Sequence, residues 1–147
     1  MKSDNYVIME FLSRSSNEGF ARMAAAGFAS QLDPTLDELG DIKTAVSEAV
    51  TNAIVHAYPD KLGKITMKMR ILDNQVLEIS IRDRGCGIDN VEQARQPLYT
   101  TGGEERSGMG FTIMESFTDR LQIKSATGKG TTVTMRKRIS QRLSGKK

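Results

Sequence analysis

The chain has 147 residues, 38% of them hydrophobic and 27% charged, which suits one domain with a proper core. Its single cysteine, Cys86, excludes an internal disulfide, and no apolar run is long enough to cross a membrane, so we expect a cytoplasmic protein without a membrane partner. The net charge of +3 arises after residue 135, where six basic and no acidic residues occur, so we expect a mildly acidic body with no basic face for nucleic acid.

The first predicted elements are a strand and a helix. Tyr6 to Leu12 alternates as a strand but is apolar on both faces, which calls for cover from a helix on one side and suggests a second subunit, hence a homodimer. Ser15 and Glu18 have the spacing of a capping box and open a helix with Arg22 on its outer side. The expected inner face of this helix is Phe20, Met23, Ala24, Gly27 and Phe28.

A second helix is predicted to begin after Asp33-Pro34, with Thr35 and Glu38 as another possible capping box. Its apolar stripe suits packing on a sheet, while Glu48, Asn52 and His56, spaced by four, form a polar ladder on another face. An amide oxygen can bind Mg²⁺ and a carboxylate one turn away can accept a proton; the alternative is an ordinary solvated helix face. The stripe consists of Leu39, Ile42, Val46, Val50, Ala53 and Ala57.

Two alternating segments, 65–71 and 77–82, predict an antiparallel hairpin that turns at Asp73-Asn74. The second strand runs into Asp83-Arg84-Gly85-Cys86-Gly87. Glycines at a strand end allow close backbone approach to a flat ligand, and Asp83 could accept a hydrogen bond from the amino group of adenine, which guanine lacks at that position. An ordinary glycine-rich turn is the alternative.

The segment 93–107 is polar and long, which predicts a mobile lid. Ser107 to Gly110 then opens a short helix, either as an anion-binding helix start or as a flexible joint, and two strands follow around the turn 128–130. The order of elements predicts an α/β fold, a two-layer sandwich with one mixed, mostly antiparallel sheet and helices on one face. We expect one domain over 1–137 and a basic, flexible tail over 138–147.

Four motifs occur in order: E-x-x-x-N in a helix, D-x-G-x-G after a strand, G-x-G opening a helix, and Gly130-Thr131-Thr132. Together they resemble the Bergerat-type nucleotide site of the GHKL ATPase superfamily. Over nearly its whole length the chain is similar to the small anti-sigma factor serine kinases, and more to their sporulation branch than to their general-stress branch. The segments that carry this likeness are 18–22, 31–35, 47–56, 94–98 and 106–115, whereas the lid between Thr101 and Arg106 is about a residue shorter than the family pattern.

The resemblance implies an ATP or ADP site with Mg²⁺. Asn52 would bind the metal, Glu48 would act as the catalytic base toward a serine hydroxyl, and Asp83, supported by Thr131, would hold the adenine amino group. The residues that would line the nucleotide and its phosphates are Gly85, Gly87, Arg106, Ser107, Gly108, Met109 and Gly110.

The implied partners are a sporulation sigma factor, held inactive by a nucleotide-bound homodimer, and an anti-anti-sigma factor that is phosphorylated on serine. Arg22 falls where the family presents its partner-contacting surface.

Several other classes of protein fit the sequence less well. A sensor histidine kinase needs a phosphoacceptor, but His56 is the one histidine and belongs to the ladder. The P-loop pattern and the H-R-D and D-F-G motifs of ordinary protein kinases do not occur. The remaining rival is a binding module that sequesters a sigma factor and uses nucleotide as a structural ligand with little catalysis.

Overall fold

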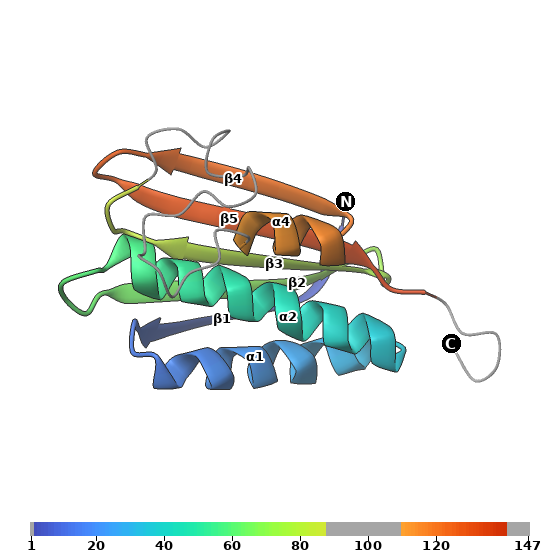
Figure 1. The fold of residues 1–147 in the computed structure, drawn as a ribbon. Coiled ribbons are helices and arrows are strands. Elements are labelled where there is room, and N and C mark those ends of the chain that lie inside the picture. The colour runs from blue at the N-terminus through green and yellow to red at the C-terminus, as the bar shows by residue number, and fades with distance from the viewer. Residues whose placement is uncertain (1, 88–109, 141–147) are drawn as a thin grey trace.

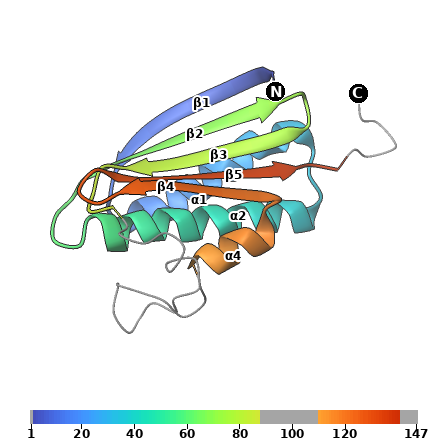
Figure 2. The same ribbon diagram turned by 90° about the horizontal axis from the view of Figure 1, so that it is seen from above.

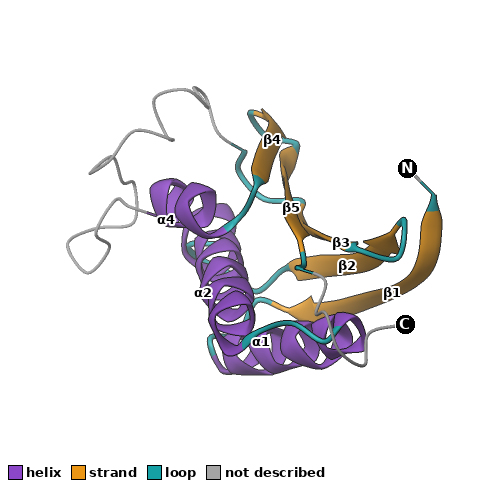
Figure 3. Cartoon of the chain, turned by 90° about the vertical axis from the view of Figure 1, so that its right-hand side faces the viewer, coloured by secondary structure: helices purple, strands orange, loops and turns teal. Residues whose placement is uncertain are grey.

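The computed structural model of the chain describes residues 2–87 and 110–140, which form a sheet layer and a helix layer (Figure 1). Helices α1, α2 and α4 all lie on one face of the sheet, as Figures 2 and 3 show from two further directions. The elements in chain order are β1 (Ser3–Leu12), α1 (Ser16–Ala29), the 3₁₀ turn η1 (Ser30–Leu32), α2 (Leu36–Asn52), the π-helical turn η2 (Ala53–Ala57), β2 (Lys64–Leu72), β3 (Val76–Asp83), α4 (Gly110–Phe117), β4 (Arg120–Ala126) and β5 (Gly130–Arg138).

The five strands form one sheet in the order β1-β2-β3-β5-β4. Each neighbouring pair of described strands is antiparallel, so the sheet has no parallel pair within the described residues. The two-layer α/β sandwich expected from the sequence is confirmed, whereas the expected mixed sheet is antiparallel throughout its described strands; β1 and β4 form its two edges.

The predicted hairpin is formed by β2 and β3. Asp73 and Asn74 both have positive φ, 52° and 60°, which is the requirement of a type I′ turn and matches the twist of the two strands. Ile65 faces Asp83 across the pair, and every second residue from there points into the core. The register therefore places the end of β3 and Asp83 on the helix-covered side.

Helix α2 is the central helix of the covering layer. Thr35 accepts a hydrogen bond from the Glu38 N–H and the Glu38 carboxylate accepts one from the Thr35 N–H, so the predicted capping box is present. The apolar stripe expected on this helix lies in the core, apart from Leu39, which is partly buried. The buried residues of α2 and η2 are Ile42, Ala45, Val46, Ala49, Val50, Ala53 and Ala57.

Helix α1 differs from the prediction in two ways. Ser15 has helical backbone angles and its side chain makes no capping hydrogen bond, so no capping box forms there. The face turned to the core is made mainly of alanines, while Phe20 and Met23 are 60% and 59% exposed. This helix has two apolar stripes, and helical periodicity alone could not decide which of them faces the core. The small alanines allow α1 to pack closely against α2 and the sheet, so Phe20 and Met23 remain outside. The residues of α1 in the core are Ala21, Ala25, Ala26, Phe28 and Ala29.

Strand β1 keeps apolar residues on its outer side. Tyr6 and Ile8 are 60% and 56% exposed, whereas Met9 and Phe11, on the other side of the strand, pack against the core. Because β1 is an edge strand of the described sheet, the backbone N–H and C=O groups on its outer edge have no neighbouring strand to bond. Tyr6 and Ile8 stand next to this edge, on the side of the sheet away from the helices. The second subunit expected to cover this strand stays a prediction.

The packed chain continues beyond β5. Ile139 is buried, its N–H donates to the Gln75 carbonyl, and the Ser140 N–H donates to the Glu38 carboxylate near the start of α2. Burial acts to raise the pKa of the Glu38 carboxyl, but the hydrogen bonds from Thr35 and Ser140 together outweigh it and lower this pKa. The end of the sheet is thus tied to the first turn of the central helix.

The sequence predicts no basic face interleaved with aromatic side chains, and the described structure shows cations that share one side of the sheet without aromatic side chains between them on β2, β3, β5 and β4. On the side of the sheet away from the helices, the antiparallel register brings Lys and Arg residues of β2, β3, β5 and β4 together. Along each strand these cations alternate with apolar core residues, so a charge count along the sequence does not reveal that they share one surface.

Candidate nucleotide-binding site

Asp83 is a buried carboxylate at the end of β3. Its Oδ1 accepts hydrogen bonds from the Gly85 N–H at 3.0 Å and the Thr131 N–H at 3.2 Å. Burial raises the pKa of Asp83, and the two backbone hydrogen bonds offset part of this rise. The hydroxyl of Thr131 is engaged with Ser125, at 2.7 Å, so Thr131 supports Asp83 through its backbone.

The second carboxylate oxygen of Asp83, Oδ2, differs from Oδ1 in its hydrogen bonding. Within the described residues no hydrogen bond reaches Oδ2, although the residue is only 7% exposed. A buried acceptor without a donor is costly, and a bound molecule that offers an N–H group would satisfy it. The exocyclic amino group of adenine is such a donor, so the residues present fit the base of an adenine nucleotide.

The glycines after Asp83 have a structural reason of their own. A Cβ on Gly85 would overlap the carbonyl oxygen of Ala57, and Gly87, at φ +78°, lies against the backbone of Ala126. The Cys86 N–H donates to the Ala57 carbonyl at 3.2 Å. The D-x-G-x-G turn is therefore packed directly on the end of η2, which fixes the acid of β3 next to the end of the second helix.

Tyr58 joins the same region and was not identified by the sequence analysis. It is buried, its hydroxyl donates to the Lys64 carbonyl at 2.8 Å, and it accepts from the Arg84 N–H at 2.7 Å. A Cβ on Gly63 would overlap its ring. Tyr58 thus connects the start of β2, the end of β3 and the end of η2. The feature of the sequence that could have indicated this role is a Tyr at the end of a helix with Gly63 five residues later, since a buried Tyr needs a partner for its hydroxyl.

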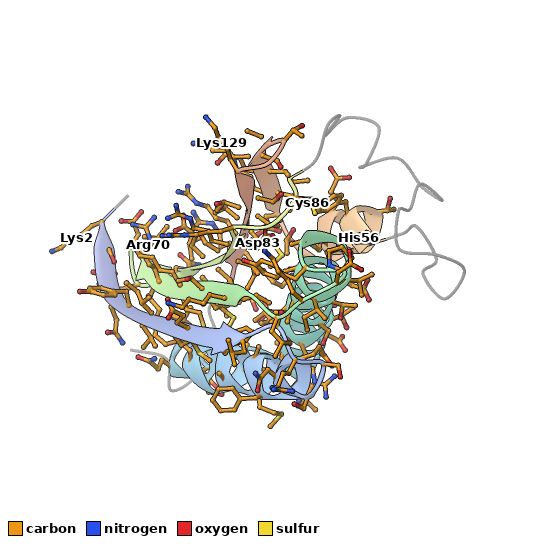
Figure 4. The ribbon with its side chains drawn as sticks, turned by 90° about the vertical axis from the view of Figure 1, so that its left-hand side faces the viewer. Lys2, His56, Arg70, Asp83, Cys86 and Lys129 are labelled. Atoms are coloured by element: carbon orange, nitrogen blue, oxygen red, sulfur yellow. The ribbon has the colours of Figure 1, made fainter. Side chains whose placement is uncertain are left out.

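Glu48 and Asn52 lie one turn apart on α2, both half-buried and away from the buried stripe, as predicted. Beyond Asn52 the helix widens into the π-helical turn η2, which has more residues per turn than an α-helix. His56 therefore does not continue the ladder with α-helical geometry. Figure 4 labels Cys86 between Asp83 and His56, and the Cys86 N–H bonds the carbonyl of Ala57, the residue after His56.

The remaining predicted nucleotide residues are partly outside the described chain. Gly110 is the first residue of α4, and the predicted short helix is confirmed, with Phe111 and Met114 in the core. The other predicted phosphate contacts, together with the expected lid, lie outside the described residues; they are Arg106, Ser107, Gly108 and Met109.

Arg22, the predicted partner contact, lies on the outer part of α1. Its guanidinium is 3.4 Å from the Glu18 carboxylate and 3.5 Å from the Ser47 hydroxyl, and its side chain is 42% exposed. Phe20 and Met23 are exposed on other sides of the same helix, because residues one or two positions apart do not share a helix face. Arg22 is presented at the surface and contacts the second helix at Ser47, the residue before Glu48.

A two-layer sandwich with a buried strand-end acid beside a helix carrying Glu48 and Asn52 is the architecture of a histidine kinase-like ATPase domain. The model of that family, described as "Histidine kinase-like ATPase domain", matches residues 13–137. A solved structure of the RsbU and RsbW domains of a Mycobacterium tuberculosis protein has a similar fold, with a TM-score of 0.66 at 18% identity over 92% of this chain and 32% of that one.

Curated relatives give a finer placement. The chain is 55% identical to the anti-sigma F factor of Caldanaerobacter subterraneus subsp. tengcongensis, over 96% of this chain and 99% of the relative. It is 53% identical to the anti-sigma F factor of Clostridium beijerinckii, over 94% and 97% of the two chains. The chain belongs to the anti-sigma F factor family.

Proposed function

We propose that this protein binds ATP or ADP with Mg²⁺, inhibits a sigma factor of the sigma-F type as a homodimer, and phosphorylates a serine of the cognate anti-anti-sigma factor. The observation that carries the nucleotide site is Oδ2 of the buried Asp83, which no donor of residues 2–87 and 110–140 reaches and which fits an adenine amino group. Gly85, Gly87, Gly110 and the segment 106–109 would complete the site.

Glu48 and Asn52 would perform the chemistry. The described residues contain no group of three or more His, Cys, Asp or Glu side chains that could hold a metal. Mg²⁺ commonly binds through one or two protein oxygens together with phosphates and water, so the amide oxygen of Asn52 suits it. Phosphoryl transfer asks the protein mainly to position charge and to orient the attacking hydroxyl, and Glu48, one turn earlier, would accept that serine proton.

The partner surfaces would be separate from the nucleotide site. Arg22 offers a cation on one side of α1, and the exposed Phe20 and Met23, three residues apart, offer an apolar pair on another side; Arg and aromatic or Met side chains are enriched in protein interfaces. A partner subunit along the open edge of β1, over Tyr6 and Ile8, would form the homodimer contact and would leave the outward side chains of β3, β5 and β4 uncovered. The described part of the chain has no helix long and apolar enough to span a bilayer, and we propose a cytoplasmic location.

The kinase activity is tested with labelled ATP, Mg²⁺ and a purified anti-anti-sigma factor. We expect Glu48→Gln to lower serine phosphorylation by about 10² to 10⁴-fold while the Kd for ATP stays within a few-fold, because a general base acts in the transfer step. Asp37→Asn, at an exposed position of the same helix, is the matched control. Equal phosphorylation by wild type and Glu48→Gln would contradict the assigned role.

The alternative is a module that sequesters the sigma factor and uses nucleotide only as a structural ligand. A serine that remains unphosphorylated at saturating ATP, while the sigma factor still co-purifies with the nucleotide-bound protein, would favour that module. Co-purification with a general-stress sigma factor instead would place the chain in the other branch. For the metal, Asn52→Ala should remove the Mg²⁺ dependence of ATP affinity, and an unchanged dependence would exclude Asn52 as a ligand.

A further inference from the structure

The side of the sheet that faces away from the helices carries three complete cross-strand rows of outward residues. Each row takes one residue from every strand, in the spatial order of the sheet. The rows are Tyr6, Arg70, Glu78, Arg136 and Arg120; then Ile8, Lys68, Ser80, Thr134 and Gln122; then Glu10, Thr66, Arg82, Thr132 and Lys124.

We call the cations on this side the basic sheet face. Two of its arginines, Arg70 and Arg136, hold the buried carboxylate of Glu78 between them at 2.6 and 2.8 Å, and Lys64 lies 3.7 Å from Glu10. These are the acidic residues at the paired outward positions. The face comprises Lys64, Lys68, Arg70, Arg82, Arg120, Lys124, Arg136 and Arg138.

Five cations of the basic sheet face form no ion pair with a carboxylate of the described chain. Lys68 lies 5.8 Å from the centre of the Tyr6 ring, and a guanidinium N–H of Arg138 donates to the Gln75 side chain. The unneutralised charge is spread over four strands, so it forms one extended positive surface. The five are Lys68, Arg82, Arg120, Lys124 and Arg138.

Between these cations the surface is hydrophilic. From β2 to β4 the three rows contain hydroxyl, amide and charged side chains and neither an aromatic nor an aliphatic one, and Ser80 and Thr134 are joined at 3.2 Å. Protein interfaces centre on apolar anchors, and single-stranded nucleic acids are bound on aromatic stacking platforms. The face offers neither, but its cations and hydroxyls are the groups that contact phosphates of a duplex.

The shape of the sheet suits a rod-like polyanion. Figure 3 shows the sheet curving so that β4 and the N-terminal end of β1 bend away from the helices. Nitrogen tips of side chains gather on that side in Figure 4, between the labelled Arg70 and the β4–β5 hairpin. Five strands at about 4.8 Å spacing span about 19 Å.

We propose that the basic sheet face binds the phosphate backbone of double-stranded DNA without reading its sequence. This activity is separate from nucleotide binding, because Asp83 points to the helix-covered side of the same sheet.

The test is binding of the full chain to a labelled 30-base-pair DNA duplex of arbitrary sequence. Four to five phosphate contacts predict that affinity falls about 150- to 500-fold between 50 and 200 mM salt. Arg82 and Lys124 both face Thr132 across the sheet. The variant Arg82→Glu with Lys124→Glu should weaken binding at least 30-fold at 100 mM salt and leave the Kd for ATP unchanged.

Two variants control for net charge and for the C-terminal tail. Arg14→Glu with Lys61→Glu makes the same change of charge in exposed segments outside the sheet, and Arg142→Gln with Lys146→Gln and Lys147→Gln neutralises the tail. Both should retain the larger part of the affinity. Equal losses in the first control and the sheet variant, or loss of binding in the tail variant alone, would overturn the proposal.

Other ligands give other results. Binding to vesicles with anionic lipid, to single strands or to duplex RNA in preference to duplex DNA would overturn it, as would no binding at 50 mM salt. If Arg82→Glu with Lys124→Glu instead changes the sedimentation coefficient of the free protein, the face is an interface between two copies of the chain and the proposal fails.

Discussion

Replacement of Asp83 by Asn separates its two carboxylate oxygens. Oδ1 accepts the N–H groups of Gly85 and Thr131, and the amide oxygen of Asn can keep both bonds. Oδ2, which has no donor within the described chain, becomes an NH₂ group. The substitution therefore preserves the local fold and removes only the acceptor that we assign to adenine.

The expected effects on folding and on binding have opposite signs. The raised pKa of Asp83 means that its ionised form is disfavoured in the folded protein, so Asp83→Asn should leave the melting temperature equal or higher at pH 7. A hydrogen bond to a charged group contributes about 1.5–3 kcal/mol, so the Kd for ATP should rise roughly 10- to 150-fold. The ratio of ATP to GTP affinity should fall, because the NH₂ group no longer opposes a carbonyl.

The assay is calorimetric titration with ATP and with GTP, alongside thermal unfolding of the apo protein. Asp60→Asn, an exposed position near the end of η2, is the matched control. Unchanged ATP affinity in Asp83→Asn would refute the adenine contact. Lowered affinity with a large loss of stability would show instead that Asp83 is mainly structural.

The pH dependence follows from the same raised pKa. An acid whose pKa is higher in the folded state contributes stability below its unfolded pKa, and that contribution is lost as pH rises through the folded value. ATP affinity should change in the other direction: it falls as pH drops, beginning above the ordinary Asp pKa of about 3.9, because protonation removes the acceptor. Asp83→Asn should abolish this part of the pH profile.

Three further substitutions test the surroundings of the site, each by chemical unfolding. Gly130→Ala, at φ +101° and against the Asp83 carbonyl, should destabilise more than Gly128→Ala, at φ +76° in open space, which should cost about 1 kcal/mol; equal costs would contradict the packing argument. Tyr58→Phe removes the one hydroxyl that bonds both the Lys64 carbonyl and the Arg84 N–H and should cost about 1–3 kcal/mol, and a smaller loss would show that water replaces the hydroxyl. Glu78→Gln removes the charge of a buried carboxylate that bonds two arginines and should lower the free energy of unfolding by about 1–3 kcal/mol. An unchanged free energy of unfolding would mean that the cost of desolvating Glu78 cancels its attraction to the two arginines.

Local sequence patterns correctly predicted those elements whose geometry depends only on residues a few positions apart. The Thr35–Glu38 capping box and the Asp73-Asn74 turn are set by hydrogen bonds and backbone angles within a few residues, and both are present. The apolar residues of α2 form one continuous stripe, so the sequence predicts a single buried face for this helix. Helix α1 has two apolar stripes, and only its close approach to α2 and the sheet selects the alanine side.

The candidate site divides in the same way. The sequence alone indicated Glu48, Asn52 and Asp83 as chemical groups, since their spacing and the motifs around them are local. One of the two bonds that hold Asp83 comes from Thr131, 48 positions away, and the turn beside Asp83 packs on Ala57. The first contact depends on strand order and the second on the π-helical end of the second helix. The basic sheet face likewise exists only once four strands are in register, because a period of two hides each cation between core residues along the chain.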